Sequence, residues 1–181
     1  MFGRCRKLEI SQALVRCLRI AAFIVVPLGV APAMAGSERR AAAMPVGEQI
    51  TAYALTLIGH PYRPRGVRPE TGFDCSGLVQ HVFERTQGIE LPRTARDMAR
   101  VGRRVAQGDL KPGDLVFYST QGRTFSHVGI YIGGGRFVHA PSSGGRVCIV
   151  DMENTYWRHH YSGGRRVLDN AKMTAASHPK I

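Results

Sequence analysis

A cysteine near the middle of the chain has the surroundings of a nucleophile. Cys75 lies in the segment Phe73-Asp-Cys-Ser-Gly-Leu78, at the start of a predicted helix. A helix N-terminus and a neighbouring imidazolium both lower the pKa of a thiol and favour the reactive thiolate. Asp74 can cap this helix, and Gly77 is expected to leave room for a substrate backbone. The alternatives are a buried structural thiol or a disulfide between Cys75 and Cys148.

Two histidines further along the chain could supply the base for that thiol. In the predicted strand 126–132, alternation places His127 on the face opposite Val128, and the Val128 face is the expected core side. His139 lies in the next predicted strand, and Gly133-Gly-Gly135 joins the two strands as a hairpin. Both imidazoles can therefore lie on one face, where one pairs with the thiol and the second orients the first.

The other histidines fit a catalytic role less well. His60 lies in a loop, and His81 lies off the apolar stripe of its helix and is expected to be exposed. The remaining ones are in a polar C-terminal region: His159, His160 and His178. A zinc site is the competing interpretation, with four ligands from Cys75, His127, His139 and Cys148. These residues lack the short spacing of structural zinc sites, so we expect no metal and no cofactor.

Helical patterns come first in the chain and strand patterns follow. Apolar spacing predicts helices over residues 46–58, 74–88 and 94–101, with a Pro- and Gly-rich loop over 60–72. Alternating and apolar runs predict strands over residues 114–118, 126–132, 136–140, 146–150 and 165–168. The sequence therefore predicts an α+β fold with an antiparallel sheet and no internal repeat.

The N-terminal residues have the pattern of a secretory signal peptide. A basic stretch precedes the apolar run Ile20–Val30, which ends at Ala33-Met-Ala35. That run is shorter than the ~20 apolar residues of a membrane-spanning helix, although an uncleaved anchor is the alternative. We expect a signal peptide over 1–35, a flexible leader over 36–45, one catalytic domain over 46–169 and a polar tail over 170–181.

The charge of the chain points to an anionic partner. The 181 residues are 44% hydrophobic, which excludes a collagen-like or wholly disordered chain, and carry a net charge of +12. The first 35 residues hold five basic side chains and one acidic one, so their removal leaves +8. Export to the periplasm or cell envelope argues against nucleic acid. The charge then favours an anionic polymer as the partner. We also expect a monomer that meets the membrane only through its signal peptide during export.

Several motifs, in order, resemble the NlpC-type cell-wall cysteine peptidases, a papain-like group of bacterial envelope enzymes. The matching segments are Pro61-Tyr62, Gly72–Leu78, Leu91–Thr94, Pro112–Phe117, His127–Gly133 and Phe137–Ala140. The resemblance extends over about residues 46–168. It implies a nucleophile helix packed on a small antiparallel sheet.

The resemblance also assigns roles to single residues. It implies that Cys75 is the nucleophile, His127 the general base and His139 the orienting third member. It places Tyr62 near the oxyanion site, where the hydroxyl could donate a hydrogen bond. The positions of Asp74 and Ser76 help to bind the substrate peptide in some relatives. The implied reaction is hydrolysis of peptide bonds in peptidoglycan stem peptides, often next to D-glutamate and diaminopimelate.

One loop departs from the family pattern. After the Pro-Tyr pair the family usually has x-Trp-Gly-Gly, whereas this chain has Arg63-Pro-Arg-Gly66. Because that loop borders the cleft in relatives, we expect an altered specificity. Arg65 and Arg93 are candidates for binding substrate carboxylates, since Arg pairs with them bidentately, or they belong to a solvated basic surface.

Two other functions remain open at this point. The chain could bind peptidoglycan without turning it over, with an idle catalytic set. It could also be an enzyme that cuts a different bond, either at the sugar–peptide junction or in a cross-link.

Overall fold

The structure is an antiparallel sheet with helices on both of its faces, which confirms the α+β class. The computed structural model describes residues 44–120, 122–143 and 145–168. Its helices are α2 (Val46–Thr56), α3 (Cys75–Gln87), α4 (Ala95–Met98), the 3-10 turn η2 (Gln107–Asp109) and α5 (Thr155–His160). Its strands are β1 (Val67–Arg68), β2 (Gly72–Phe73), β3 (Arg103–Val105), β4 (Leu115–Tyr118), β5 (His127–Gly133), β6 (Arg136–His139), β7 (Cys148–Asp151) and β8 (Tyr161–Arg166).

Six of the strands form one sheet in the order β3-β8-β4-β5-β6-β7, with every neighbouring pair antiparallel. β1 and β2 form a separate two-stranded ribbon. The β5–β6 hairpin places Ile130 opposite Val138, and β7 places Cys148 opposite His139. The expected hairpin is confirmed, and it brings the strands of the two candidate histidines side by side.

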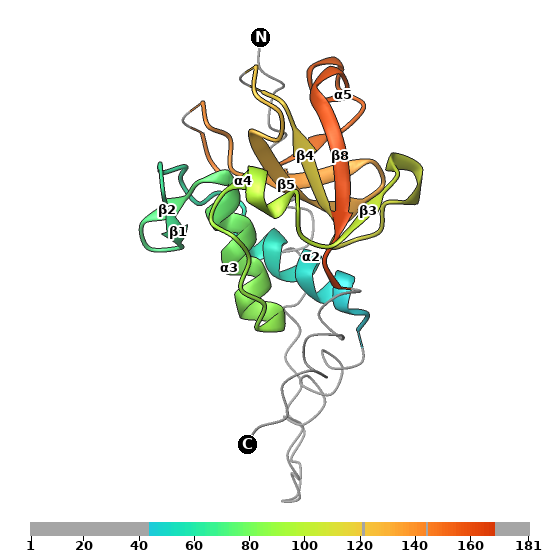
Figure 1. Cartoon of the computed structure of the whole chain (residues 1–181). Coiled ribbons are helices and arrows are strands. Elements are labelled where there is room, and N and C mark those ends of the chain that lie inside the picture. The colour runs from blue at the N-terminus through green and yellow to red at the C-terminus, as the bar shows by residue number, and fades with distance from the viewer. Residues whose placement is uncertain (1–43, 121, 144, 169–181) are drawn as a thin grey trace, which may run out of the picture. The chain divides into compact units, whose positions relative to one another are not determined.

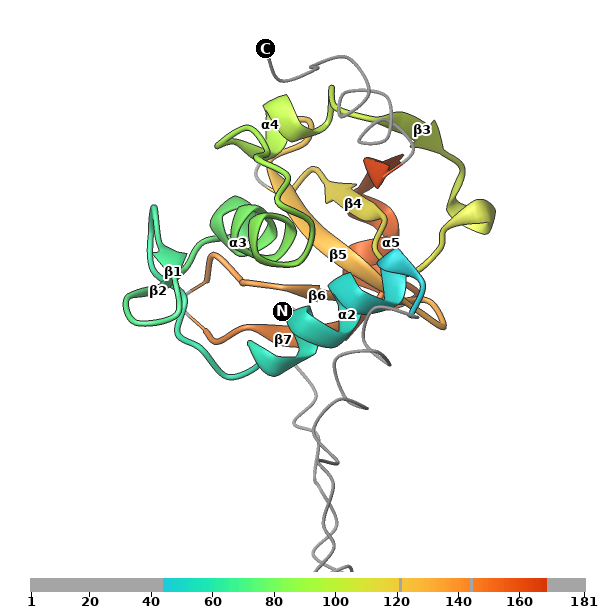
Figure 2. The same cartoon turned by 90° about the horizontal axis from the view of Figure 1, so that it is seen from below.

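The larger core lies between one face of the sheet and two helices. α2 and α3 pack against each other and against β5 (Figures 1 and 2). Val128 and Ile130 of β5 are fully buried in this core, as the alternation predicts. The apolar stripes of the two helices fill it from the other side with Ile50, Ala54, Leu78, Val79, Val82 and Phe83.

The opposite face of the sheet is also buried, which the sequence analysis did not anticipate. Trp157 of α5 lies in a second apolar cluster together with Val116, Tyr118, Phe137, Cys148, Val150 and Met152. Tyr118 stacks on Phe137 with ring centroids 4.8 Å apart, and Trp157 meets both rings edge-on. The face that carries the candidate histidines is therefore an interior surface.

The nucleophile helix begins and ends where its residue types predict. The Asp74 side chain accepts a hydrogen bond from the Gly77 N–H (2.7 Å) and caps the first turn of α3. Gly88 ends the helix with φ 64°, the left-handed conformation that glycine adopts without steric cost.

Several expected elements differ in extent. β3, α5 and the β1–β2 ribbon were not predicted, and β8 covers 161–166 instead of 165–168. β3 is three residues long and pairs with β8, so it depends on a contact that is distant in sequence. His81 was expected to be exposed, which is wrong. It is partly buried because its ring packs against those of Tyr53 and Phe73, and its Nε2 lies 3.0 Å from the Tyr53 hydroxyl.

The expected signal peptide and most of the leader lie outside the described residues, as does the polar tail. The described residues from Pro45 onward belong to one compact unit. Among the described residues, no helix combines the length and the apolar character needed to cross a bilayer.

Gly77 does not leave space for a substrate backbone, contrary to the expectation. A Cβ atom at this position would overlap the backbone carbonyl of Gly66. The first turn of α3 thus packs directly under the loop that carries Arg63-Pro-Arg-Gly66, and Gly66 also accepts a hydrogen bond from the Asp74 N–H (3.0 Å). The glycine is needed for packing between helix and loop.

We expect Gly77→Ala to lower the free energy of unfolding by about 1–3 kcal/mol, because the backbone carbonyl of Gly66 cannot move aside as a side chain could. Urea denaturation measures this change. Gly108→Ala is the matched control, since no atom lies within 4 Å of a Cβ there. Equal stabilities of the two variants would contradict this packing argument.

Candidate active site

Cys75 is the first residue of α3 and carries a free thiol. The residue is partly buried and packs against the larger core, as does Tyr62. α3 packs against β5, and the backbone N–H of Val128 in that strand is near enough to the thiol to influence its pKa. Val128 follows His127 directly in β5. The structure therefore brings the predicted nucleophile to the strand that carries the predicted base.

A charged cluster fixes the start of the nucleophile helix. Arg93 donates from Nη2 to Asp74 Oδ2 (2.6 Å) and from Nη1 to Asp74 Oδ1 (3.1 Å). The same Nη1 donates to Ser76 Oγ (2.8 Å), and that hydroxyl donates to Asp74 Oδ1 (3.2 Å). Such a bidentate pair has a defined geometry. Arg93, expected to bind a substrate carboxylate, is thus already paired within the protein.

The two strand histidines lie in direct contact, as their spacing predicts. His127 Nε2 is 2.8 Å from His139 Nδ1, and the rings meet edge-on with centroids 5.0 Å apart. His139 Nε2 lies 3.5 Å from Cys148 Sγ. The side chains are almost inaccessible, at 3% exposed for His127 and 2% for His139. This geometry supports one ring orienting the other.

Trp157 covers both histidines, and sequence analysis did not single it out. Its ring centroid lies 4.9 Å from that of His139 and 5.5 Å from that of His127. Phe137 lies 5.3 Å from His139 on another side. As the single tryptophan of the chain, between a polar turn and two histidines, it gave no periodic signal. Its role depends on α5 folding back onto the sheet.

Burial determines the protonation of the site. It lowers the pKa of His127 to about 4 and that of His139 well below 6.5, with the neighbouring His127 adding to the second shift. Burial also raises the pKa of the Cys75 thiol, as does the Asp74 carboxylate, more than the backbone N–H groups lower it. The expected thiolate is therefore not the resting form. With the pKa of the thiol raised and those of the two imidazoles lowered, all three groups are neutral at rest.

Tyr62 and Arg65 lie on the loop beside the nucleophile. Burial raises the pKa of Tyr62, and the charges of Cys75 and Asp74 raise it further. Arg65 is exposed and has φ 60°, a left-handed conformation that costs a non-glycine residue about 1–2 kcal/mol. The family's glycine would adopt it freely. The loop that departs from the family pattern thus keeps a glycine-like backbone conformation at Arg65.

The alternatives that involve Cys148 receive no support here. Because Cys75 carries a free thiol, it does not pair with Cys148. Cys148 lies in β7 beside His139, within the second apolar cluster. Among the described residues, no group of three or more His, Cys, Asp or Glu side chains is arranged to hold a metal ion.

The buried histidines predict how stability depends on pH. Both pKa values are lower in the folded state than the 6.5 of an exposed histidine, so the unfolded chain binds more protons between about pH 4 and 6.5. Stability therefore falls as the pH falls through this window, by up to about 1.4 kcal/mol per pH unit for each histidine. Urea denaturation at several pH values measures the slope.

His139→Gln should reduce this slope, whereas His159→Gln should leave it unchanged because His159 is exposed. The same slope in wild type and His139→Gln would show that His139 is not held neutral by the fold.

The sequence is similar to those of known proteins of one family. The family model described as NlpC/P60 matches residues 59–166. The chain is 46% identical over 117 residues to the murein DD-endopeptidase MepH of Escherichia coli (strain K12), covering 63% of this chain and 43% of that protein. It is 44% identical over 135 residues to the gamma-DL-glutamyl hydrolase of Bacillus subtilis (strain 168), covering 73% of this chain and 32% of that protein.

A solved structure has a similar fold. An NLP/P60 family protein of Staphylococcus aureus subsp. aureus Mu50 is 37% identical, with a TM-score of 0.61, over 67% of this chain and 41% of that chain. The chain thus spans less than half of the length of these three proteins. The family model matches more than half of this chain, and the chain belongs to the NlpC/P60 family.

Proposed function

We propose that the chain is a cysteine endopeptidase that hydrolyses amide bonds in peptidoglycan stem peptides through an acyl-enzyme on Cys75. The observation that carries the proposal is the buried contact between His127 and His139, together with a free thiol at the start of α3, the helix that packs against the strand of His127. Two relatives, named as a murein DD-endopeptidase and a gamma-DL-glutamyl hydrolase, support the substrate class. The candidate bonds are the D-glutamyl–diaminopimelate bond and the cross-link bonds.

The neutral pair determines how the reaction begins. Since Nε2 of His127 is engaged with His139 Nδ1, its Nδ1 is the nitrogen that can accept the thiol proton. For that tautomer, His127 Nε2–H donates to His139 Nδ1, and His139 Nε2 carries the hydrogen that points at Cys148 Sγ. The second histidine thus holds the first in the tautomer that a base requires.

Proton transfer and attack then occur together. His127 takes the thiol proton as Cys75 Sγ bonds to the amide carbonyl carbon. Collapse of the tetrahedral intermediate breaks the C–N bond, and His127 gives its proton to the leaving amine. Water attacks the resulting thioester, His127 takes a proton from it, and the thiol leaves with that proton. Tyr62, close to Cys75, is the candidate donor to the oxyanion.

Asp74 and Ser76 are proposed to contact the substrate peptide and Arg65 one of its carboxylates. For the whole protein we propose export through residues 1–35 into the periplasm or cell envelope, and action as a monomer. The proposed catalytic domain covers residues 46–169, between the leader and the polar tail.

Cys75→Ala should abolish muropeptide release from purified peptidoglycan, with activity at least about a thousandfold below wild type, because no other nucleophile replaces the thiol. Product masses identify the bond that is cut. His159→Gln is the matched control, since His159 is exposed on α5, and it should keep wild-type activity. The wild-type pH profile should keep its acidic limb near pH 4, because activity needs neutral His127.

Muropeptide release by Cys75→Ala would refute the proposal. Binding of peptidoglycan by the wild type with no turnover would instead favour the wall-binding alternative.

Arg65→Glu should raise the KM for carboxylate-bearing muropeptides about fivefold or more and reverse the salt dependence, if Arg65 pairs with a substrate carboxylate. Arg65→Asn is the control for backbone conformation, since Asn tolerates positive φ, and it should show a smaller rise. Arg68→Glu changes the same charge in β1 and should have little effect. Identical kinetics for Arg65→Glu and wild type would remove Arg65 from the substrate site.

A further inference from the structure

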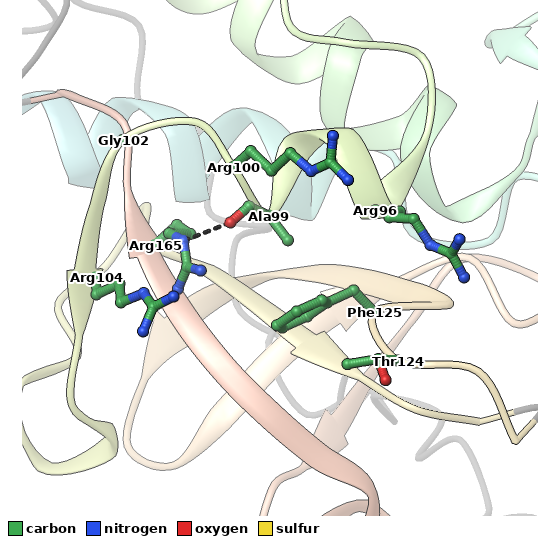
Figure 3. A pocket seen from close by; sticks show the side chains of 8 residues that line it. All are labelled: Arg96, Ala99, Arg100, Gly102, Arg104, Thr124, Phe125 and Arg165. Carbon is green, nitrogen blue, oxygen red and sulfur yellow. Dashed lines mark hydrogen bonds between the residues drawn. The ribbon is translucent and has the colours of Figure 1, made fainter.

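A concave site between the α4 segment and the paired strands β3 and β8 is lined by four arginines. Its cavity has a volume of about 580 Å³. The lining residues are Arg96, Ala99, Arg100, Gly102, Arg104, Thr124, Phe125 and Arg165, with no acidic side chain among them (Figure 3). Within the described residues, none of the four guanidinium groups forms an ion pair with a carboxylate.

Arg165 is the unusual member of this group, because a buried charge normally has a counterion. It is only 7% exposed, and its Nε donates to the Ala99 carbonyl (2.6 Å) and its Nη1 to the Gly164 carbonyl (2.9 Å). Its Nη2 has no hydrogen-bond partner among the described residues. The guanidinium is thus held in place by two backbone carbonyls, with donor capacity left over.

Arg104 lies directly opposite Arg165 in the β3–β8 pair. Like charges in this position destabilise a sheet. Burial lowers the pKa of Arg165, and the positive charge of Arg104 lowers it further. Figure 3 shows the two guanidinium groups close together at one end of the pocket, with Arg96 and Arg100 on the segment across it. An anion placed here would relieve this repulsion.

The pocket adjoins a hollow whose lining includes sequence neighbours of Arg93 and His127. An adjoining hollow shares Arg96 and Phe125 with it and continues to Thr94 and Ser126. Thr94 follows Arg93 of the charged cluster, and Ser126 precedes His127. A polymer bound at Cys75 could therefore extend along this surface into the arginine pocket.

The lining favours a peptide carboxylate over a bare phosphate. The Phe125 ring lies 5.9 Å below the Arg165 guanidinium, and Ala99 adds further apolar surface. Apolar walls beside fixed guanidinium groups suit a carboxylate attached to a peptide, since Arg binds carboxylates bidentately while the rest of the peptide packs on carbon.

We propose that this arginine pocket binds stem-peptide carboxylates of peptidoglycan away from the bond cut at Cys75. The inference rests on the proposed substrate, and it adds a second point of attachment for the same polymer. Two attachment points raise the overall affinity for a polymer, whereas a short fragment gains little from them.

The test measures binding without turnover. The full chain carrying Cys75→Ala is co-sedimented with purified peptidoglycan, and with peptidoglycan whose carboxyl groups have been amidated. Arg100→Gln/Arg104→Gln should weaken binding to untreated peptidoglycan about tenfold, and amidation should abolish the difference. Arg136→Gln/Arg158→Gln is the matched control, because it removes the same charge from exposed positions outside the pocket.

Thr124→Glu provides an independent variant, since it places a carboxylate inside the pocket without removing an arginine. It should cause a similar loss even if the double variant folds poorly. Equal losses in the pocket and control variants would overturn the proposal, as would a loss that persists on amidated peptidoglycan. Arginine-dependent binding to phosphatidylglycerol vesicles but not to peptidoglycan would assign the pocket to phosphate instead.

Muropeptide release by wild-type protein is measured in parallel. If the wild type releases muropeptides while the pocket and control variants bind peptidoglycan equally well, only the proposal for the pocket is refuted. If the wild type releases none while binding depends on the pocket arginines, only the proposed hydrolase activity is refuted.

Discussion

Asp74 holds together the three parts of the chain that build the nucleophile region. It caps α3 through the Gly77 N–H, accepts the Ser76 hydroxyl and pairs with Arg93 from a separate segment. Its own N–H donates to Gly66 in the preceding loop. This arrangement has a cost, because a negative charge next to Cys75 raises the pKa of the thiol. Arg93 offsets part of that charge while fixing its position. Asp74 thus fixes the position of Cys75 and at the same time disfavours its thiolate form.

Desolvation of the two histidines is compatible with a reaction that starts from a neutral thiol. A neutral thiol is a weak nucleophile, but a neutral imidazole with one nitrogen available is a competent base. Trp157 and Phe137 exclude water around both histidine rings, which keeps them neutral well below the usual pH of histidine titration. In the proposed reaction, charge appears only as the substrate reacts, in a site where fixed dipoles act strongly because little water screens them. The backbone N–H groups near the sulfur are such dipoles.

The sequence predicted the parts of this site that depend on local pattern. The residues of single elements predicted the cap before Cys75, the glycine that ends α3 and the alternation around His127. The Gly133–Gly135 turn predicted that two strands form a hairpin. Trp157, the Arg93–Asp74 pair and the role of Gly77 could not be predicted in this way. Each depends on a contact between segments that only the packed fold brings together, such as α5 lying over β5 and β6. The prediction of a lowered pKa for the Cys75 thiol was wrong for the same reason, because the burial of the thiol depends on such contacts.

The arginines of the sheet region differ in whether a carboxylate of the protein pairs with them. Arg93 pairs with Asp74, and Arg166 pairs with Asp114 in the sheet, where Nη2 lies 2.7 Å from Oδ2. Arg165 is equally well fixed but faces Arg104 in place of a carboxylate. Folding alone would favour an acidic or apolar residue at one of these two positions, since an unpaired buried charge lowers stability. An anion bound from outside would neutralise both positive charges. In the proposed binding mode, that anion is a stem-peptide carboxylate of the polymer held at Cys75.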